Sequence, residues 1–558
     1  MSQPIAFTLS SRNPPPNISA FGPRTATFCI RNIAIDTPGM LTCTSRGVVP
    51  HLSHDNVKRT KGIRWIHTPF ESFLEHKPPV PTLQPQQGQS PKINSFLRFS
   101  EDEYVLSVSL RDLGDGREMP ANTNAFVTAN CIQGVRRVTP SDWQSYMISC
   151  NPDIVFSLSD VPFTPPPYSQ KRLTKSIERS ALWLSDILRS SGPSPGPRSK
   201  PSNVFVQMAG SASAPARTAF ADSLIEILHG KEAEAIHPLE CLDEGVAGYV
   251  FDMVPLRLAL LGGGGGGGGG NLSLESFNTL FRASLSVLPK TKPRLVTSAR
   301  GPHEMLRLIQ DVGIDLFDTQ WAQRSADIGV ALDFTFPVPS HEVSGKRDLG
   351  HNLYDTAYAR DFSSMMGSDG LISGVSCQCG ACSPCSVSPS EILRHSSVDS
   401  ELGAKSGGTS DAPLNPAYTR AFLHHLLHTH EMSAHSLLAM HNITVMDGFF
   451  AGIRAVLSQN DLAVFEAETS RFFETYSEDT DGAGSQNVFR AAEKCWAEVE
   501  ILRGKGRLAR ESEKEKAESA AAANIVLTME MEEKGAEGGS GAAVSLPFAP
   551  DGESMITS

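Results

Sequence analysis

Short apolar runs alternate with amphipathic segments from about residue 139 to residue 317, and this alternation constrains the fold more than any other feature of the chain. Strands separated by helices at this spacing predict parallel βαβ units. A long succession of such units favours a (β/α)8 TIM-type barrel, with a doubly wound α/β sheet as the alternative. The expected strands are Ile154–Leu158, Val204–Met208, Gly248–Val254, Arg294–Thr297 and Ile314–Phe317, and the expected helices are Lys171–Leu188, Ala216–Leu228, 273–287 and 302–311.

Length, net charge, cysteine distribution and apolar runs limit the classes of protein to which this chain can belong. With 558 residues and a formal net charge of −12, the chain is long enough for a large barrel with insertions and lacks the basic character of a protein that coats nucleic acid. Four of its ten cysteines lie between residues 377 and 385, which favours metal binding in a reducing compartment over a disulfide scaffold. No apolar run reaches roughly eighteen residues, so we expect no integral membrane segment.

Low-complexity segments indicate how the chain is divided. We expect a flexible N-terminus at residues 1–22, a barrel domain at 23–503 and a disordered tail at 504–558. The nine glycines from Gly262 to Gly270 would lose much conformational entropy on ordering, so we expect a flexible loop there. Residues 386–413 are rich in Ser, Gly and Asp and are predicted to be a disordered insertion.

Three cysteines form a C-x-C-x2-C cluster at Cys377, Cys379 and Cys382. Gly380 and Ala381 are small enough for the backbone to curl and bring the three sulfurs together. Thiolates are soft ligands that suit zinc, and a tetrahedral structural site then needs one more ligand. The candidates for that ligand are Cys385, His395, His424, His425, His428, His430, His435 and His441.

Helical periodicity favours His441 among these candidates. A helix from about residue 432 places Leu437, His441, Val445 and Phe449 on one stripe, so His441 faces inward among apolar neighbours. A histidine on such a stripe is more often a hydrogen-bonded core residue than a ligand. The nearby thiolates reverse that preference.

Cys385 remains the alternative fourth ligand. It ranks second because four sulfurs within nine residues would strain one small loop around a tetrahedral ion. We expect one structural Zn²⁺ per subunit, in a zinc-binding subdomain at about residues 375–458, with no open coordination position. The metal would tie a long loop onto the C-terminal helices.

These residues closely resemble the zinc segment of the tRNA-guanine transglycosylase family. The cysteines are followed by Tyr418–Leu426 and then by the pair His441-Asn442, and the insertion at 386–413 accounts for a longer gap than the family has. The resemblance extends from about residue 25 to 500 and implies that three cysteines and the histidine bind zinc. The other matching segments are Thr37–Leu41, Thr44–Leu52 and Gly313–Asp318, together with Arg324 and Gly329.

Asp318 matches the family's nucleophile, but the residues around it do not match. In catalytic members this aspartate, at the end of a barrel strand, attacks C1′ of the target ribose while guanine departs. The family's Asp-Ser-Gly-Gly-[FY]-Gln segment, which supplies a second carboxylate, has no counterpart in residues 122–135. Residues 319–323 also replace the family's Cys-Val-x-Pro-Thr. We therefore predict no catalytic residue in this chain and treat Asp318 as vestigial.

The positions that would hold the base match the family at some residues and differ from it at others. The family's paired glycines, which let a flat base lie against bare backbone, are replaced in Gly248–Met253, where Phe251 and Asp252 are expected to fill the space. Asp160 and Gln207, in contrast, match base-binding residues of catalytic members. Their alternative interpretations are a strand-end carboxylate and an ordinary polar barrel residue, and the sequence leaves both open.

The resemblance therefore implies a non-catalytic accessory subunit that forms a heterodimer with the catalytic subunit of a queuine-inserting enzyme. The pair would exchange guanine for queuine at wobble position 34 of tRNAs with GUN anticodons, those for Asp, Asn, His and Tyr. A cytoplasmic location is implied, with room for peripheral association with the mitochondrial outer membrane. The alternatives are a catalytically competent homodimer that uses Asp318, Asp160 and Gln207, and a zinc-stabilised barrel that only scaffolds RNA or protein.

Short basic clusters are the expected contacts with tRNA phosphates, although clusters of this size are usually solvated surface. The clusters are Lys171-Arg172 with Lys175, Lys290 with Lys292 and Arg294, and Arg503–Arg510.

Overall fold

The structure is a computed structural model of the chain, and it describes most of the predicted barrel domain. The predicted glycine loop beyond Gly262, Cys385, the insertion at 386–413 and the tail at 504–558 all lie outside the described residues, as does the predicted boundary at residue 503. The described residues are 4–10, 21–83, 93–117, 119–162, 166–189, 203–262, 274–339, 345–367, 377–382, 418–478 and 487–499.

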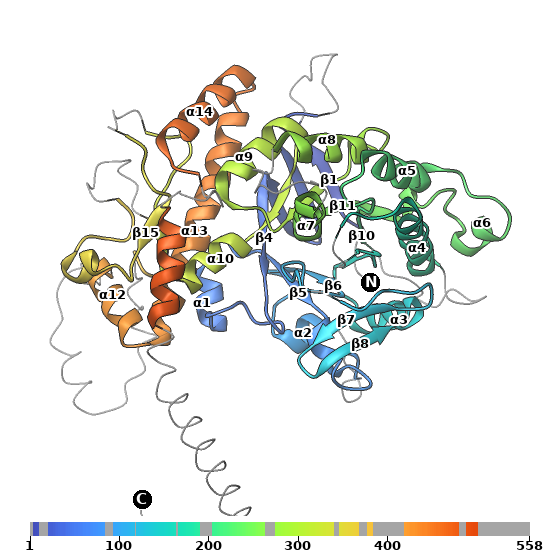
Figure 1. The fold of residues 1–558 in the computed structure, drawn as a ribbon, viewed down its shortest axis with the longest axis horizontal. Coiled ribbons are helices and arrows are strands. Elements are labelled where there is room, and N and C mark those ends of the chain that lie inside the picture. Colours follow the sequence, from blue (N-terminus) through green and yellow to red (C-terminus); the bar gives the residue numbers. More distant parts are fainter. Residues whose placement is uncertain are drawn as a thin grey trace, which may run out of the picture. The chain divides into compact units, whose positions relative to one another are not determined.

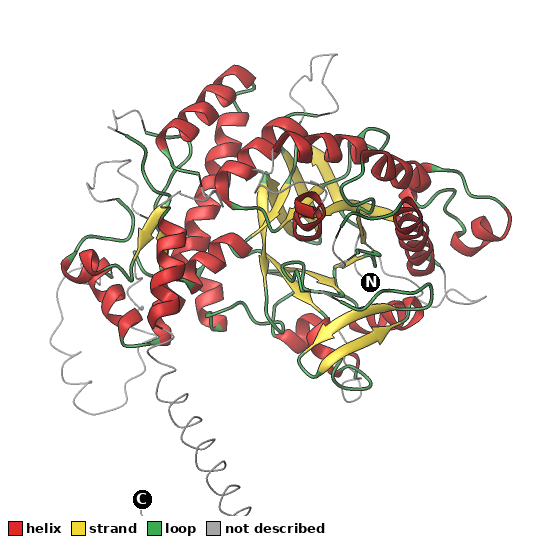
Figure 2. Cartoon of the chain, viewed as in Figure 1, coloured by secondary structure: helices red, strands yellow, loops and turns green. Residues whose placement is uncertain are grey.

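Eight parallel strands form a closed barrel, which confirms the predicted TIM-type fold over the doubly wound alternative (Figures 1 and 2). The last strand pairs with the first, Leu316 opposite Gly39, and so closes the ring. Because all eight strands run the same way, their carboxyl ends meet at one end of the barrel, where TIM-barrel sites are built. The strands are β4 (Gly39–Cys43), β5 (Trp65–Pro69), β6 (Val105–Ser109), β9 (Ile154–Phe156), β10 (Val204–Gln207), β11 (Val246–Asp252), β12 (Arg294–Thr297) and β13 (Leu316–Asp318).

Helices flank the barrel strands on the outside. α4 (Gln170–Leu188) begins after Ser169, whose hydroxyl accepts the backbone N–H of Arg172 as an N-cap. α9 (Gly301–Val312) ends at Gly313, where φ is 73° and glycine avoids the strain of a side chain. The other helices of this part are α1 (His54–Arg59), α2 (Ile93–Leu97), α3 (Pro140–Cys150), α5 (Ala214–Ile225), α6 (Gly230–Ile236), α7 (Met253–Gly262), α8 (Leu274–Leu285) and α10 (Gln320–Asp327).

A three-stranded antiparallel sheet packs onto the barrel core from the N-terminal segment: β1 (Ala6–Leu9), β2 (Ala26–Ile30) and β3 (Ile33–Thr37). Phe28 of β2 stacks on Trp65 at the start of β5, with ring centroids 4.9 Å apart, and both side chains are fully buried. The prediction of a flexible N-terminus was wrong for β1, because backbone pairing with β2 orders a segment whose composition favours a loop. Residues 11–20 lie outside the described part.

Three of the barrel strands, β4, β5 and β6, precede the strand–helix alternation from which the barrel was predicted. They were missed because the described residues between them form only short helices: α1 lies between β4 and β5, and α2 between β5 and β6. β5 and β6 also carry polar residues into the core. His67 lies within hydrogen-bond distance of the hydroxyls of Ser107 and Ser109, at 2.9 and 3.0 Å, so these buried polar groups are satisfied.

A β-hairpin interrupts the connection from β6 to β9. It consists of β7 (Val127–Cys131) and β8 (Gly134–Val138), paired antiparallel outside the barrel. The indole N–H of Trp183 on α4 donates to the carbonyl of Asn124, just before the hairpin, at 3.3 Å. The segment that leads into the hairpin therefore contacts α4.

Three C-terminal helices pack beside the barrel: α12 (Arg420–His428), α13 (Met432–Leu457) and α14 (Leu462–Thr475). The long helix α13 packs against α10, β4 and the small sheet of β14 (Val330–Leu332) and β15 (Gly350–Asn352) (Figure 1). It begins at the predicted residue, and its predicted inward stripe is buried. Residues 488–499 form a further helix. Among the helices that the structure describes, none is long and apolar enough to cross a bilayer.

Candidate functional site

The four predicted metal ligands come together in one cluster. Cys377, Cys379 and Cys382 lie on one loop and His441 projects from α13, and their ligand atoms all lie within 4.8 Å of one another. The distances from His441 Nδ1 to the three sulfurs are 3.7, 3.6 and 3.4 Å in chain order. A tetrahedral zinc with Zn–S near 2.3 Å and Zn–N near 2.1 Å has an S···N edge of about 3.6 Å, so this donor set fits the ion.

Contacts behind His441 fix which of its nitrogens faces the sulfurs. Nε2 donates to the carbonyl of Leu332 at 2.8 Å, which leaves the lone pair of Nδ1 directed at the thiol cluster. The next residue, Asn442, accepts the N–H of the same Leu332 through Oδ1 at 3.0 Å. Hydrogen bonds from Cys377 and Cys382 lower the pKa of Cys379, as suits a thiolate ligand. A bound zinc would cross-link the loop to α13.

The other candidate ligands that the structure describes do not belong to this cluster. Cys385 and His395 lie outside the described residues, so the all-cysteine alternative stays a prediction. Three of the remaining histidines bond backbone carbonyls through Nδ1: His424 with Leu353, His428 with His424 and His435 with Ala326, at 2.9, 2.9 and 3.1 Å.

Asp318 lies at the carboxyl end of β13, where a barrel nucleophile would stand, but its side chain is buried and already hydrogen-bonded. Oδ2 accepts the backbone N–H of Ser298 at 2.7 Å, and Oδ1 accepts that of Gln320 at 3.3 Å. Burial raises the pKa of Asp318 to about 7, and the neighbouring Asp112 adds like-charge repulsion. The carboxyl is thus held in a closed environment.

Side chains from the neighbouring loops close over this position. The hydroxyl of Ser298 donates to Oε1 of Gln320 at 2.7 Å, while Nε2 of Gln320 lies 3.4 Å from Oδ1 of Asp112. A Cβ added to Gly114 would come within 2.4 Å of the Gln320 amide, so the loop after β6 packs directly on that side chain. Ser298 and Gln320 therefore bind Asp318 through their backbones and each other through their side chains.

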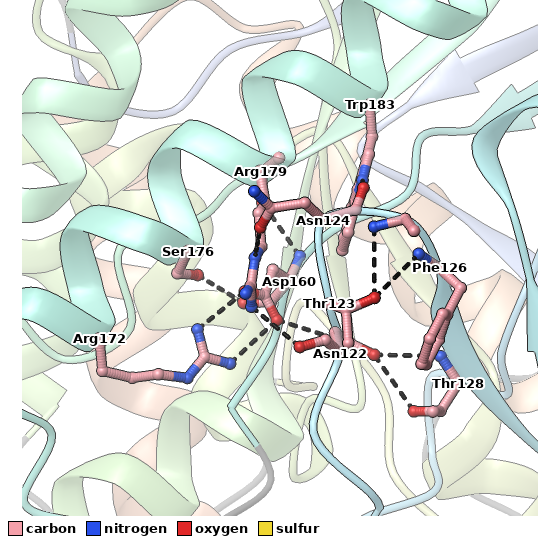
Figure 3. Close-up of polar contacts among 12 residues, drawn as sticks. Asn122, Thr123, Asn124, Phe126, Thr128, Asp160, Arg172, Ser176, Arg179 and Trp183 are labelled. Carbon is pink, nitrogen blue, oxygen red and sulfur yellow. Dashed lines mark hydrogen bonds and ion pairs between the residues drawn. The ribbon is translucent and has the colours of Figure 1, made fainter.

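Asp160 follows β9 and is fully buried at the centre of a polar network (Figure 3). Arg172 binds it with two nitrogens, at 2.8 and 2.9 Å, and Arg179 with one, at 3.0 Å. Nδ2 of Asn122 donates to Oδ1 of Asp160 at 2.8 Å. Four hydrogen bonds fill the acceptor positions of one carboxylate. Asp160 therefore fits the structural interpretation of a strand-end carboxylate, which the sequence had left open.

Two partners of Asp160 were not predicted from the sequence. Arg179 was not singled out, and Asn122 was noted only because a carboxylate is missing there. One signal was present: Arg172 and Arg179 are seven residues apart, so they lie two turns apart on one face of α4.

Gln207, the second predicted base-binding residue, ends β10 and faces two adjoining cavities at the carboxyl end of the barrel. Both cavities are also lined by Ser159 and Asp252, and the second is lined by Asp160. Asp318 lines neither of the two. The structure thus places Gln207 and Asp160 on one cavity and leaves Asp318 outside it.

One expected pocket residue, Phe251, points the other way. Its ring packs on Phe281 of α8, with centroids 4.6 Å apart, on the outer face of the barrel. Alternate residues of a strand face opposite sides, so when Val250 and Asp252 face inward Phe251 faces the helices. The expectation that Phe251 fills the base position was wrong, whereas Asp252 lines both cavities and its role there stays a prediction.

In two of the basic clusters expected to contact tRNA, some side chains are buried or paired with other groups of the protein. Arg172 is committed to Asp160, and Arg294 is only 2% exposed. Lys292 pairs with Asp243 at 2.6 Å. Arg172 and Lys292 thus pair with internal carboxylates, and the Arg294 side chain donates to the backbone carbonyl of Val312 at 2.6 Å. The cluster from Arg503 to Arg510 lies outside the described residues.

The metal centre leads to a prediction about zinc content. Replacing His441 or Cys382 by Ala should reduce bound zinc from about one ion per chain to near zero and lower the melting temperature, because a structural site loses its tetrahedral set. Metal content by mass spectrometry and thermal unfolding measure this. His425→Ala, an exposed histidine of α12, is the matched control. Unchanged zinc in the His441 variant would favour Cys385 instead.

The buried Asp318 leads to a prediction about pH. Its pKa is about 7 in the folded chain against 3.8 ordinarily, so the folded state holds a proton that the unfolded state has released between these values. This contribution to stability is complete below pH 3.8 and is lost as pH rises through about 7. The melting temperature of Asp318→Asn relative to the wild type should therefore increase from pH 5 to pH 8. A difference independent of pH would contradict this, and Glu474→Gln, at an exposed position of α14, is the control.

Comparison with known proteins agrees with this geometry. The sequence model of a family described as queuine tRNA-ribosyltransferase matches residues 20–405 and 409–475. Three relatives carry the name queuine tRNA-ribosyltransferase accessory subunit 2. The fission yeast Schizosaccharomyces pombe protein is 24% identical over 82% of each chain. The Xenopus laevis and Homo sapiens proteins are 26% and 25% identical over 77% of this chain and 91% of theirs. Since the family match spans well over half of its length, this chain belongs to the queuine tRNA-ribosyltransferase family.

Proposed function

We propose that this chain is a non-catalytic accessory subunit that works with a separate catalytic subunit. The pair would exchange guanine for queuine at wobble position 34 of tRNAs with GUN anticodons. The names of the relatives support an accessory subunit of this enzyme. A cytoplasmic location and peripheral association with the mitochondrial outer membrane stay predictions.

The observation that carries the proposal is the state of the two inherited carboxylates. Asp318 is buried beside a Ser298–Gln320 contact, and Asp160 has its acceptor positions filled by protein donors. A nucleophile needs to reach the reacting carbon at about 3–3.5 Å, and a base-binding carboxylate needs free acceptors. Neither condition is met, which favours the accessory role over a competent homodimer.

The zinc centre has a supporting role in this proposal. We propose that Cys377, Cys379, Cys382 and His441 bind one structural Zn²⁺. The backbone N–H of Tyr418 donates to the carbonyl of Ala381, inside the cysteine loop, at 3.0 Å. The metal would thereby fix the start of α12 as well as the loop.

An exposed aromatic patch beside the zinc centre is the proposed contact for the catalytic subunit. The patch consists of Phe362, Tyr418 and Phe422, which are 75%, 37% and 41% exposed. Tyr418 and Phe422 stack with centroids 5.5 Å apart, and backbone bonds from Arg420 and Ala421 hold the segment of Phe362 alongside. Aromatic anchors on a rigid support are typical of binding hot spots.

The first test of the proposal is guanine exchange into tRNA by the purified chain with and without a catalytic partner. The chain alone should exchange no base, and the mixture should be active. Asp318→Asn should leave the activity of the mixture unchanged, because this carboxylate takes no part in the reaction. Exchange by the isolated chain that Asp318→Asn abolishes would establish the competent homodimer instead. Salt-sensitive tRNA binding that gains no activity with any partner would favour a scaffold.

The second test addresses the aromatic patch. Phe422→Arg should weaken binding to the catalytic subunit at least about tenfold, since a charge replaces a hot-spot aromatic. Isothermal titration calorimetry measures the affinity, and zinc content shows that the metal centre is intact. Ile132→Arg, at a position 63% exposed at the tip of the β7–β8 hairpin, is the matched control. Equal affinity of both variants would remove the patch from the interface.

A further inference from the structure

Two histidines stand one turn apart on α12, outside the metal centre described above. His424 and His428 are four residues apart, so their side chains lie on the same face of the helix. Their ring centroids are 4.1 Å apart. His428 is the last residue of α12 and is exposed, and His424 is partly exposed. The helix lies beside α13 and away from the barrel strands, so this pair of imidazoles is open to solvent (Figure 1).

Hydrogen bonds to backbone carbonyls fix the tautomer of both rings. Nδ1 of His424 donates to the carbonyl of Leu353, and Nδ1 of His428 donates to the carbonyl of His424, each at 2.9 Å. Because a carbonyl only accepts, Nδ1 carries the proton and Nε2 keeps its lone pair. Neither Nε2 atom makes a hydrogen bond with a described residue. His441 is held in the same manner, since one ring nitrogen donates to the carbonyl of Leu332 and the other is directed at the metal centre.

A carboxylate lies near the pair. Burial lowers the pKa of His424, and the hydrogen bond to Leu353 and the negative charge of Asp355 oppose that effect. Oδ1 of Asp355 accepts the backbone N–H of Ala357 at 2.9 Å, while Oδ2 has no hydrogen-bond partner among the described residues. Two lone pairs beside a negative charge form an environment that attracts a cation.

We propose that His424 and His428 bind one divalent transition-metal ion through their two Nε2 atoms. Imidazole nitrogens suit Zn²⁺, Ni²⁺ and Cu²⁺, whereas Ca²⁺ and Mg²⁺ prefer oxygen ligands. Two nitrogens bound to one tetrahedral ion lie about 3.4 Å apart. Small rotations about χ2, a torsion with a broad energy minimum in histidine, bring rings with centroids 4.1 Å apart to that spacing.

The proposed ion differs in kind from the one expected in the metal centre. Since the two histidines supply only part of a coordination shell, water completes it and the ion is exchangeable. It would join the last turn of α12 to the turn before it, and so stiffen the helix that carries Phe422 of the aromatic patch. The inference does not rest on the proposed function, because it needs neither tRNA nor a partner subunit.

The test is isothermal titration calorimetry of the full chain with Ni²⁺, after its zinc content has been measured. The wild type should bind one Ni²⁺ ion in addition to its zinc. His424→Asn and His428→Asn should each weaken this binding at least about tenfold, because a two-ligand site becomes a single ligand. Asparagine keeps a donor near the position of Nδ1 and has no counterpart of Nε2. His425→Asn, at an exposed neighbouring position of α12, is the matched control and should bind Ni²⁺ as the wild type does.

Bound Ni²⁺ should also raise the melting temperature of the wild type and of His425→Asn more than that of the other two variants, since a ligand of the folded state stabilises it. If His424→Asn does not fold, His428→Asn tests the site by itself, because His428 is exposed at the helix end. Two results would overturn the inference: no Ni²⁺ uptake by the wild type beyond its zinc, or equal affinity for Ni²⁺ in a folded His428→Asn chain.

Discussion

The C-terminal part of the structure depends on two hydrogen bonds from side chains of α13 to the backbone of one residue, Leu332. His441 bonds its carbonyl and Asn442 its N–H, so consecutive side chains satisfy both polar groups of a buried strand residue. A buried backbone group left unpaired is costly, which makes this contact hard to replace. The same contact turns Nδ1 of His441 toward the three sulfurs. The position of the helix and the geometry of the Cys/His cluster therefore depend on the same contact.

At the carboxyl end of the barrel, the contacts of Asp160 and Asp318 reflect the free-energy cost of burying a carboxylate. Asp160 is paired with two arginines. Asp318 has backbone donors but no cation bound to it among the described residues, and burial raises its pKa to about 7. In both cases protein groups have taken the places that reactants would need. Both carboxylates are therefore held by contacts within the chain, which is the observation behind the proposed accessory role.

The sequence predicted the features that depend on residues near one another in the chain, and it missed features that depend on distant residues. The strands from Ile154 onward and the helix that carries His441 followed from periodicity, which is a local property. The first three barrel strands did not, because short or irregular connections removed the alternation. β1 was missed because it is a strand only through its pairing with β2. Phe251 was misplaced because a residue's place on a strand face depends on register, which the sequence alone did not fix.

The sequence by itself determined the class of fold and the four residues of the Cys/His cluster, since these rest on residue type and spacing. Only the tertiary structure decided what the remaining charged residues do. Arg172 and Arg294 looked like surface cations in the chain, yet they point inward to buried groups. For Asp160 the sequence left base binding and a strand-end carboxylate both open, and its four hydrogen bonds fit the second. The physical reason is that the role of a charged side chain depends on the groups that it contacts, and those groups come from distant parts of the chain.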